Sequence, residues 1–174
     1  MIHRCQARHT LALAIAASIA LLGQPAAQSS QQAAPADLRA MLEGTWQLDE
    51  WHTGGPVLRP PQIDGRWSNH DGVVVVVYSR HDTRQTSAGY GTYRITPDTW
   101  SYIYTRMHNS SAPASGAATV TMTEPNDLRS FKIVRAPGKV ILEGVGGDRR
   151  EYDGTFFTFM QNGQIVRKWR RVTP

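Results

Sequence analysis

Cysteine is almost absent from this chain of 174 residues, in which Cys5 is the only one. A single thiol excludes an intramolecular disulfide and a zinc site built from several cysteines. Cys5 also precedes the main apolar run, so lipid attachment through a cysteine after that run is not expected. The fold must therefore be held together by its hydrophobic core.

A long hydrophobic run is lacking as well. The run Leu11–Leu22 is shorter than the roughly 20 apolar residues of a membrane-spanning helix. It follows a basic head with Arg4 and Arg8 and precedes small residues up to Ala27, which is typical of a secretory signal peptide. A buried N-terminal helix is the alternative. We expect a signal peptide over residues 1–27.

This prediction bears on localisation. Cleavage is expected after Ala27, with Ala36 as a second option, because both follow a small-x-small pattern. The mature chain would then contain no membrane span. We expect the protein in the periplasm or secreted.

Charge is not concentrated on one segment. The formal net charge is +5, and the basic residues are scattered apart from Arg149–Arg150 and a cluster over residues 167–171. Proteins that bind nucleic acid usually gather Lys and Arg on one face. No nucleic-acid partner is expected.

Motifs for metal or phosphate chemistry are also lacking. His52, His70, His81 and His108 do not show the close spacing of metal ligands. The glycine-rich stretches lack the glycine–lysine pattern of a phosphate-binding loop. The sequence therefore predicts no metal and no cofactor, and it favours a binding protein over an enzyme.

Helical periodicity is confined to one turn near residues 37–42. Elsewhere, short runs rich in Val, Ile, Thr, Tyr, Phe and Trp alternate with Gly, Pro, Asn and Asp, as in β-proteins. The strongest turn signal is Asn162-Gly163, which suits a tight hairpin. Strands are predicted at 44–52, 73–79, 89–95, 99–107, 117–123, 130–135, 139–145, 150–153, 155–161 and 164–172.

Such a meander avoids exposed strand edges by closing on itself. We predict an all-β fold, a single antiparallel up-and-down β-barrel of about 8–10 strands over residues 39–174. A sandwich is the alternative. Residues 28–38 are expected to form a flexible linker, and residues 53–71 and 108–116 long loops at the barrel rim.

Both ends of the predicted barrel carry a motif. The first strand opens with Gly44-Thr45-Trp46 within the segment Leu42–Leu48, and the last ends with Trp169-Arg170-Arg171. Between them, Gly91-Thr92-Tyr93 is followed by Pro97-Asp98-Thr99, a third motif. Together these residues resemble the bacterial lipocalin-like domain family of the lipocalin superfamily.

The resemblance implies that Gly44 and Trp46 close one end of the barrel, with an arginine from the last strand lying across the indole. Arg171 is the expected arginine, and Arg170 is the alternative because strand parity at the C-terminus is open by one residue. The resemblance further implies that a small hydrophobic ligand is bound inside the barrel. It implies no particular reaction.

Strand parity predicts which side chains would line this interior. If Trp46 points inward, every second residue after it shares its face, and the strand near residues 99–107 offers a similar row of aromatic residues. Ordinary core packing is the alternative for the aromatic residues, and a solvated rim for Glu50 and His52. The predicted ligand-binding residues are Leu48, Glu50, His52, Tyr90, Trp100, Tyr102, Tyr104 and Arg106.

Three functions follow as hypotheses. The first is an exported protein that binds a small apolar or amphipathic molecule. The second is an isomerase or cyclase in which Glu50 or His52 acts as acid or base and Tyr102 or Tyr104 donates a hydrogen bond. A carboxylate held near apolar walls, as expected for Glu50, would have a raised pKa suited to that role. The third is a non-enzymatic envelope interaction module. The sequence leaves the ligand and the oligomeric state open.

Overall fold

The computed structural model describes residues 35–112, 115–123 and 127–173. The predicted signal peptide, its cleavage after Ala27 and most of the predicted linker lie outside these residues. Residues 35–38, expected in the linker, instead begin the helix α1 (Pro35–Leu42). Leu38 and Leu42 on α1 are buried in the core, which explains why the helix begins within the segment predicted to be a linker. In the described part of the chain, no helix is long and apolar enough to cross a bilayer.

Eleven strands follow α1 within the described residues, and every neighbouring pair is antiparallel. A 3₁₀ turn, η1 (Val145–Gly147), precedes β9. The strands are β1 (Gly44–Trp51), β2 (Ile63–His70), β3 (Val73–Arg80), β4 (Gln85–Ile95), β5 (Thr99–Ser111), β6 (Thr119–Thr123), β7 (Arg129–Ala136), β8 (Lys139–Glu143), β9 (Asp148–Tyr152), β10 (Phe156–Gln161) and β11 (Gln164–Arg171).

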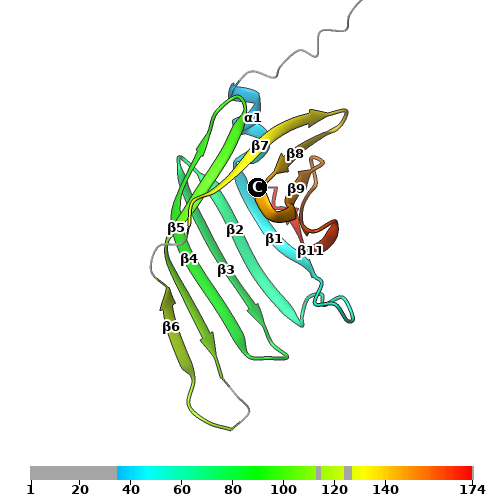
Figure 1. The fold of residues 1–174 in the computed structure, drawn as a ribbon. Helices are drawn as coiled ribbons and strands as arrows, with labels where there is room; N and C mark the ends of the chain where they lie inside the picture. Colours follow the sequence, from blue (N-terminus) through cyan, green and yellow to red (C-terminus); the bar gives the residue numbers. More distant parts are fainter. Residues whose placement is uncertain (1–34, 113–114, 124–126, 174) are drawn as a thin grey trace, which may run out of the picture. The chain divides into compact units, whose positions relative to one another are not determined.

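Ten of these strands form a closed barrel (Figure 1). Strands β1 to β5 and β7 to β11 pair in chain order, and β11 pairs back with β1. The remaining strand, β6, pairs with the far end of β5 and extends from the barrel at the end opposite α1. The predicted all-β, antiparallel up-and-down barrel is confirmed.

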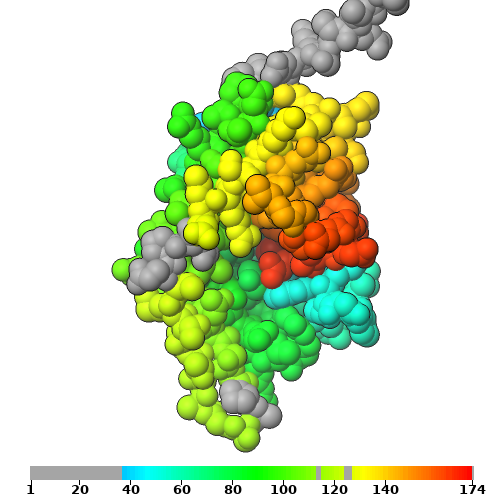
Figure 2. Space-filling view, in the orientation of Figure 1, coloured from blue at the N-terminus to red at the C-terminus, as the bar shows by residue number. Residues whose placement is uncertain are grey.

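Pairing between the first and last strands completes the wall. Trp46 lies opposite Arg171 and Leu48 opposite Trp169 in the antiparallel ladder. In Figure 2 the cyan surface that follows β1 lies beside the orange-to-red surface of the last strands. Closure leaves no free edge along this seam, where an open sheet would expose unpaired backbone groups.

The strand β2 corrects one prediction. The sequence predicts an irregular loop over residues 53–71, but Ile63–His70 forms β2 between β1 and β3. Ile63, Gly65, Trp67 and Asn69 are buried while the residues between them are more exposed, which is the alternation of a strand with one wet face. The dense Pro and Gly residues before β2 concealed this short pattern.

The five consecutive valines on β3 also alternate. Val74 and Val76 are buried, whereas Val73, Val75 and Val77 are exposed on the outer face. Because valine is favoured in strands by its branched side chain on either face, apolar composition alone does not reveal which face is inside. The run is thus an ordinary barrel strand with an unusually apolar outer face.

Aromatic side chains fill the half of the interior nearest α1. Ring centroids of Trp46 and Trp67 lie 4.8 Å apart, and Trp67 stacks on Phe157 at 5.0 Å. Such pairs are stabilised by both burial and ring geometry. The largest fully buried side chains are Trp46, Trp67, Trp100, Trp169, Phe131 and Phe157. This end of the barrel is therefore solid.

Candidate functional site

The closed end of the barrel is fastened by Arg171. Its guanidinium carbon lies 5.6 Å from the ring centroid of Trp46. Nη2 donates to the carbonyls of Ala40 and Glu43, at 3.1 and 2.7 Å. Nη1 donates to the carbonyl of Met41 at 3.1 Å. One side chain thus ties the last strand to α1 and the first strand.

Gly44 makes room for this arginine. A Cβ atom at Gly44 would lie 3.1 Å from Nη2 of Arg171, and its φ of +152° is strained for other residues. Arg170, the alternative partner, points outward and donates to Asp49 at 2.7 Å. The arginine that lies on Trp46 is Arg171.

Beyond the packed aromatic layer, the interior is hollow. The first space, the inner cavity, has a volume of about 110 Å³. Six aromatic and three arginine side chains dominate its wall, with Val76 and Met107. The aromatic residues and arginines are Trp67, Tyr78, Tyr102, Tyr104, Phe159, Trp169, Arg129, Arg150 and Arg167.

A larger space, the outer cavity, has a volume of about 350 Å³. Tyr78 and Arg167 line both cavities, so the two spaces adjoin at these residues. Most of the outer wall is polar, with serines and threonines from β4, β5 and β6 as well as Asn109. The molecule therefore has a polar entrance that leads to an aromatic, cationic interior.

The predicted site residues divide into two groups. Tyr102 and Tyr104 line the inner cavity, and burial raises the pKa of Tyr104 well above its usual range, so its hydroxyl stays protonated. Leu48 and Trp100 point inward but belong to the fully buried core. Trp100 is thus a core-packing residue, as in the alternative given for the aromatic residues.

Tyr90 and Arg106 lie opposite each other on the outside of the β4–β5 pair. The expected inward orientation of both is wrong. For Arg106 the cause is a bulge opposite Tyr90 and Gly91, which inserts Thr105 into β5, whereas Tyr90 lies on the outer face of an unbroken alternation in β4. Met107 instead takes the inward position and lines the inner cavity. The inward positions on either side of Tyr90 are Gly89 and Gly91, and a Cβ at Gly91 would lie 1.8 Å from a backbone oxygen of β5.

Glu50 and His52 also fail to share the face of Trp46. A bulge between Leu48 and Glu50 leaves both Asp49 and Glu50 on the outer side, and Trp51 takes the inward position. Trp51 accordingly lines the outer cavity. A bulge shifts parity by one residue, which no alternation rule applied to the sequence can anticipate.

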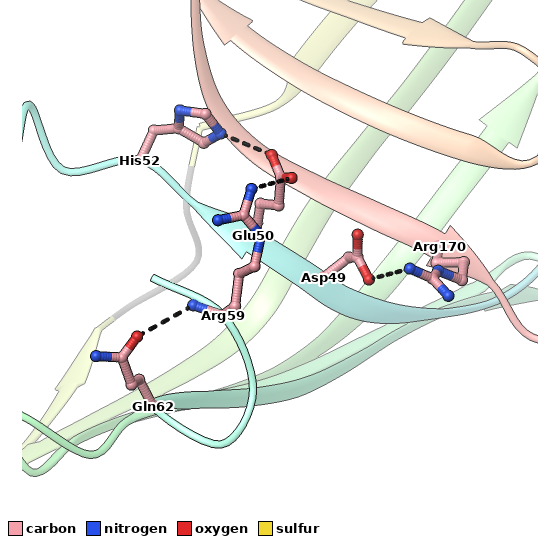
Figure 3. Close-up of polar contacts among 6 residues, drawn as sticks. All are labelled: Asp49, Glu50, His52, Arg59, Gln62 and Arg170. Carbon is pink, nitrogen blue, oxygen red and sulfur yellow. Dashed lines mark hydrogen bonds and ion pairs between the residues drawn. The ribbon is translucent and has the colours of Figure 1, made fainter. Parts of the chain in front are cut away.

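Ion pairing, rather than an apolar wall, surrounds Glu50 (Figure 3). Its carboxylate lies 3.0 Å from Nε2 of His52 and accepts a hydrogen bond of 2.8 Å from Nη2 of Arg59. The hydrogen bond with His52, together with Arg59, holds the pKa of Glu50 below its usual value. The raised pKa expected for an acid catalyst is therefore wrong at this position.

Sequence reasoning missed Arg150 and Arg167 as interior residues. For Arg167 a signal existed, because Arg167, Trp169 and Arg171 alternate on β11 and Trp169 is an obvious core residue. Arg150 carries no comparable signal beyond its spacing from Tyr152. Basic residues are so seldom buried that composition argues against both.

The described residues contain no group of three His, Cys, Asp or Glu side chains placed to hold a metal ion. Fold and site together define a closed antiparallel barrel with an interior cavity that opens through a polar mouth. No protein-family model, curated protein or solved structure matches the chain.

Proposed function

We propose that this chain is an exported lipocalin-like protein that binds a small apolar or amphipathic molecule inside its barrel. The observation that carries the proposal is the aromatic inner cavity, continuous in its lining with an outer cavity of about 350 Å³. Ligand sites are typically concave, lined by aromatic residues with a few polar groups, and roughly 300–1,000 Å³ in volume. Export is supported by the pattern of the first 27 residues.

The packed end explains why a ligand would enter from one side. Trp46 and Arg171 seal the interior next to α1, while Ser87 and Asn109 are among the polar residues at the opposite mouth. A molecule entering at the mouth would meet Tyr78 and Arg167 before it reached the inner cavity. This geometry suits a carrier with one entrance.

Two measurements test the proposal. Organic extraction of the purified protein followed by mass spectrometry should release a small molecule. Titration of extracted protein with a fluorescent fatty-acid analogue should saturate at one equivalent, with enhanced emission as the fluorophore leaves water. Protein that releases nothing and binds no analogue would rule out the carrier function.

The alternative, an envelope interaction module, is favoured by a different observation. Val73, Val75, Val77 and Tyr90 are 42–49% exposed on the outer face of β3 and β4. Exposed apolar patches often mark interaction surfaces. A barrel that binds no small molecule but forms assemblies in sedimentation experiments, lost on Val75→Lys, would support this alternative.

A further inference from the structure

Arg150 is a charged residue buried within the barrel, with only 2% of its surface exposed. Its guanidinium carbon lies 4.2 Å from the ring centroid of Phe159 and 4.4 Å from that of Phe131. Trp100 and Tyr102 lie 5.4 and 5.0 Å away. Four rings therefore stabilise a cation in a space from which solvent is excluded.

The hydrogen-bonding capacity of Arg150 is only partly used. Nη2 donates to the hydroxyl of Tyr102 at 2.7 Å and to Oδ2 of Asp148 at 3.4 Å. Its Nε is buried and has no hydrogen-bond partner within the described residues. A buried guanidinium with an unused donor calls for an acceptor, since unpaired buried polar groups are unfavourable.

Arg167 repeats this situation at the junction of the two cavities. Its guanidinium carbon lies between Trp51 and Tyr78, 4.3 and 4.6 Å from their ring centroids. Its Nε is likewise buried, and no described residue accepts a hydrogen bond from it. The indole Nε1 of Trp169, another residue of the inner wall, also lacks an acceptor there.

Charge on the inner wall is of one sign. Arg129, Arg150 and Arg167 line the inner cavity, and none of the described wall residues is acidic. Asp148, which is not a wall residue, pairs with Arg150 through the contact of 3.4 Å between its Oδ2 and Nη2. Of the three arginines, Arg150 is buried, Arg167 is half-buried and Arg129 is exposed. A buried cation such as Arg150 is costly unless an anion or an array of acceptors offsets it.

We propose that the inner cavity binds the carboxylate of an amphipathic organic acid, held by Arg150 and Arg167, with the apolar body of the ligand against the surrounding rings. The inference rests on the proposed carrier function and specifies its ligand. A planar carboxylate matches the fork of N–H groups on guanidinium and supplies the acceptors that both Nε atoms lack. Tyr104, kept protonated by burial, adds no negative charge to oppose it.

The test is a displacement titration with a neutral reporter, Nile red, and two competitors of equal chain length, decanoate and methyl decanoate. The wild-type barrel should bind decanoate at least about tenfold more tightly, as expected for a charge-assisted hydrogen bond. Arg167→Gln and Arg150→Met should abolish the difference, and Arg167→Lys should restore part of it. Arg170→Gln is the matched control on β11, because Arg170 points outward to Asp49, and it should keep the full difference.

Each result has a separate meaning. Nile red binding to the variants, with unchanged circular dichroism, shows that the barrel is still folded and its cavities still accessible. Equal affinity for acid and ester in the wild type overturns the carboxylate inference and leaves the carrier function standing. A difference that Arg170→Gln removes as fully as Arg167→Gln also overturns it, since this indicates general surface charge. Failure of Nile red and both competitors to bind the wild type overturns the carrier function itself.

Discussion

Trp46 and Arg171 show how much a pair of residues contributes to closing a barrel. Trp46 is fully buried between Trp67, Tyr152 and Phe157, so its removal leaves a large cavity among aromatic rings. Arg171 spans the seam between the first and last strands, and its loss leaves three backbone carbonyls without their hydrogen-bond donor. The indole contributes packing, and the guanidinium contributes hydrogen bonds.

Substitutions at these positions should therefore differ in cost. Trp46→Ala should lower the free energy of unfolding by about 3–5 kcal/mol, as large aromatic-to-alanine changes in cores do. Arg171→Met should cost about 2–3 kcal/mol through unpaired carbonyls. Arg170→Met should cost less than about 1 kcal/mol, because Arg170 pairs with Asp49 on the surface. Urea denaturation measures all three; equal losses for the two arginine variants would contradict the assignment of Arg171 to the seal.

At the level of the strands, three bulges interrupt the ladders of the described residues, and two of them decide which side chains reach the interior. The three lie in the β1–β11, β4–β5 and β10–β11 pairs. The first brings Trp51 inward in place of Glu50, and the second brings Met107 inward in place of Arg106. The third lies next to Arg167, which faces the cavities in phase with Trp169 on β11. All three occur towards the open half of the barrel, where the inner and outer cavities lie.

The bulge in β1 also creates an ion pair that responds to pH. The pKa of Glu50 is lowered in the folded state, so its contribution to stability is present above the unfolded value near 4.5 and is lost as pH falls through the folded pKa. Glu50→Gln should be less stable than the wild type by up to about 1 kcal/mol at pH 7, given the exposure of Arg59. This difference should shrink at pH 3.

Denaturation of both proteins at the two pH values checks this prediction, and a difference independent of pH would refute it. A double-mutant cycle supplies the control. Arg59→Gln should cost less in the Glu50→Gln background than in the wild type, because its partner carboxylate is already neutral.

The sequence predicted the elements better than the side-chain directions. Ten of the strands were anticipated because turn residues and alternating runs are local signals, whereas β2 was hidden behind the prolines at 60 and 61. Tyr102 and Tyr104 were correctly expected at the inner wall, since they precede the bulge in β5. Glu50, His52 and Arg106 were misplaced because they follow bulges. Such parity shifts depend on how a strand pairs with its neighbours and leave no local trace in the sequence.

At the scale of the whole molecule, the barrel combines a solid end with a hollow one. Aromatic packing and the Arg171 seal hold the α1 end, which frees the opposite half from the need to fill its interior. Closed barrels of this size can either fill their interior with side chains or enclose a single ligand. This one does both, in two halves of the same cylinder.

If the hollow half of the barrel accommodates a ligand, a variant that fills the inner cavity should bind it less tightly. Val76 is 5% exposed and lines the inner cavity, whereas its neighbour Val75 is 44% exposed on the outer face of the same strand. Both Val76→Phe and Val75→Phe are titrated with the fluorescent fatty-acid analogue after circular dichroism has shown that they are folded. The first substitution fills the inner cavity, and the second is a matched control that adds the same side chain on the outer face. Val76→Phe should weaken binding at least about tenfold, by occupying volume that a ligand needs, while Val75→Phe should bind as the wild type does. Equal binding by both variants would contradict a ligand site in the inner cavity.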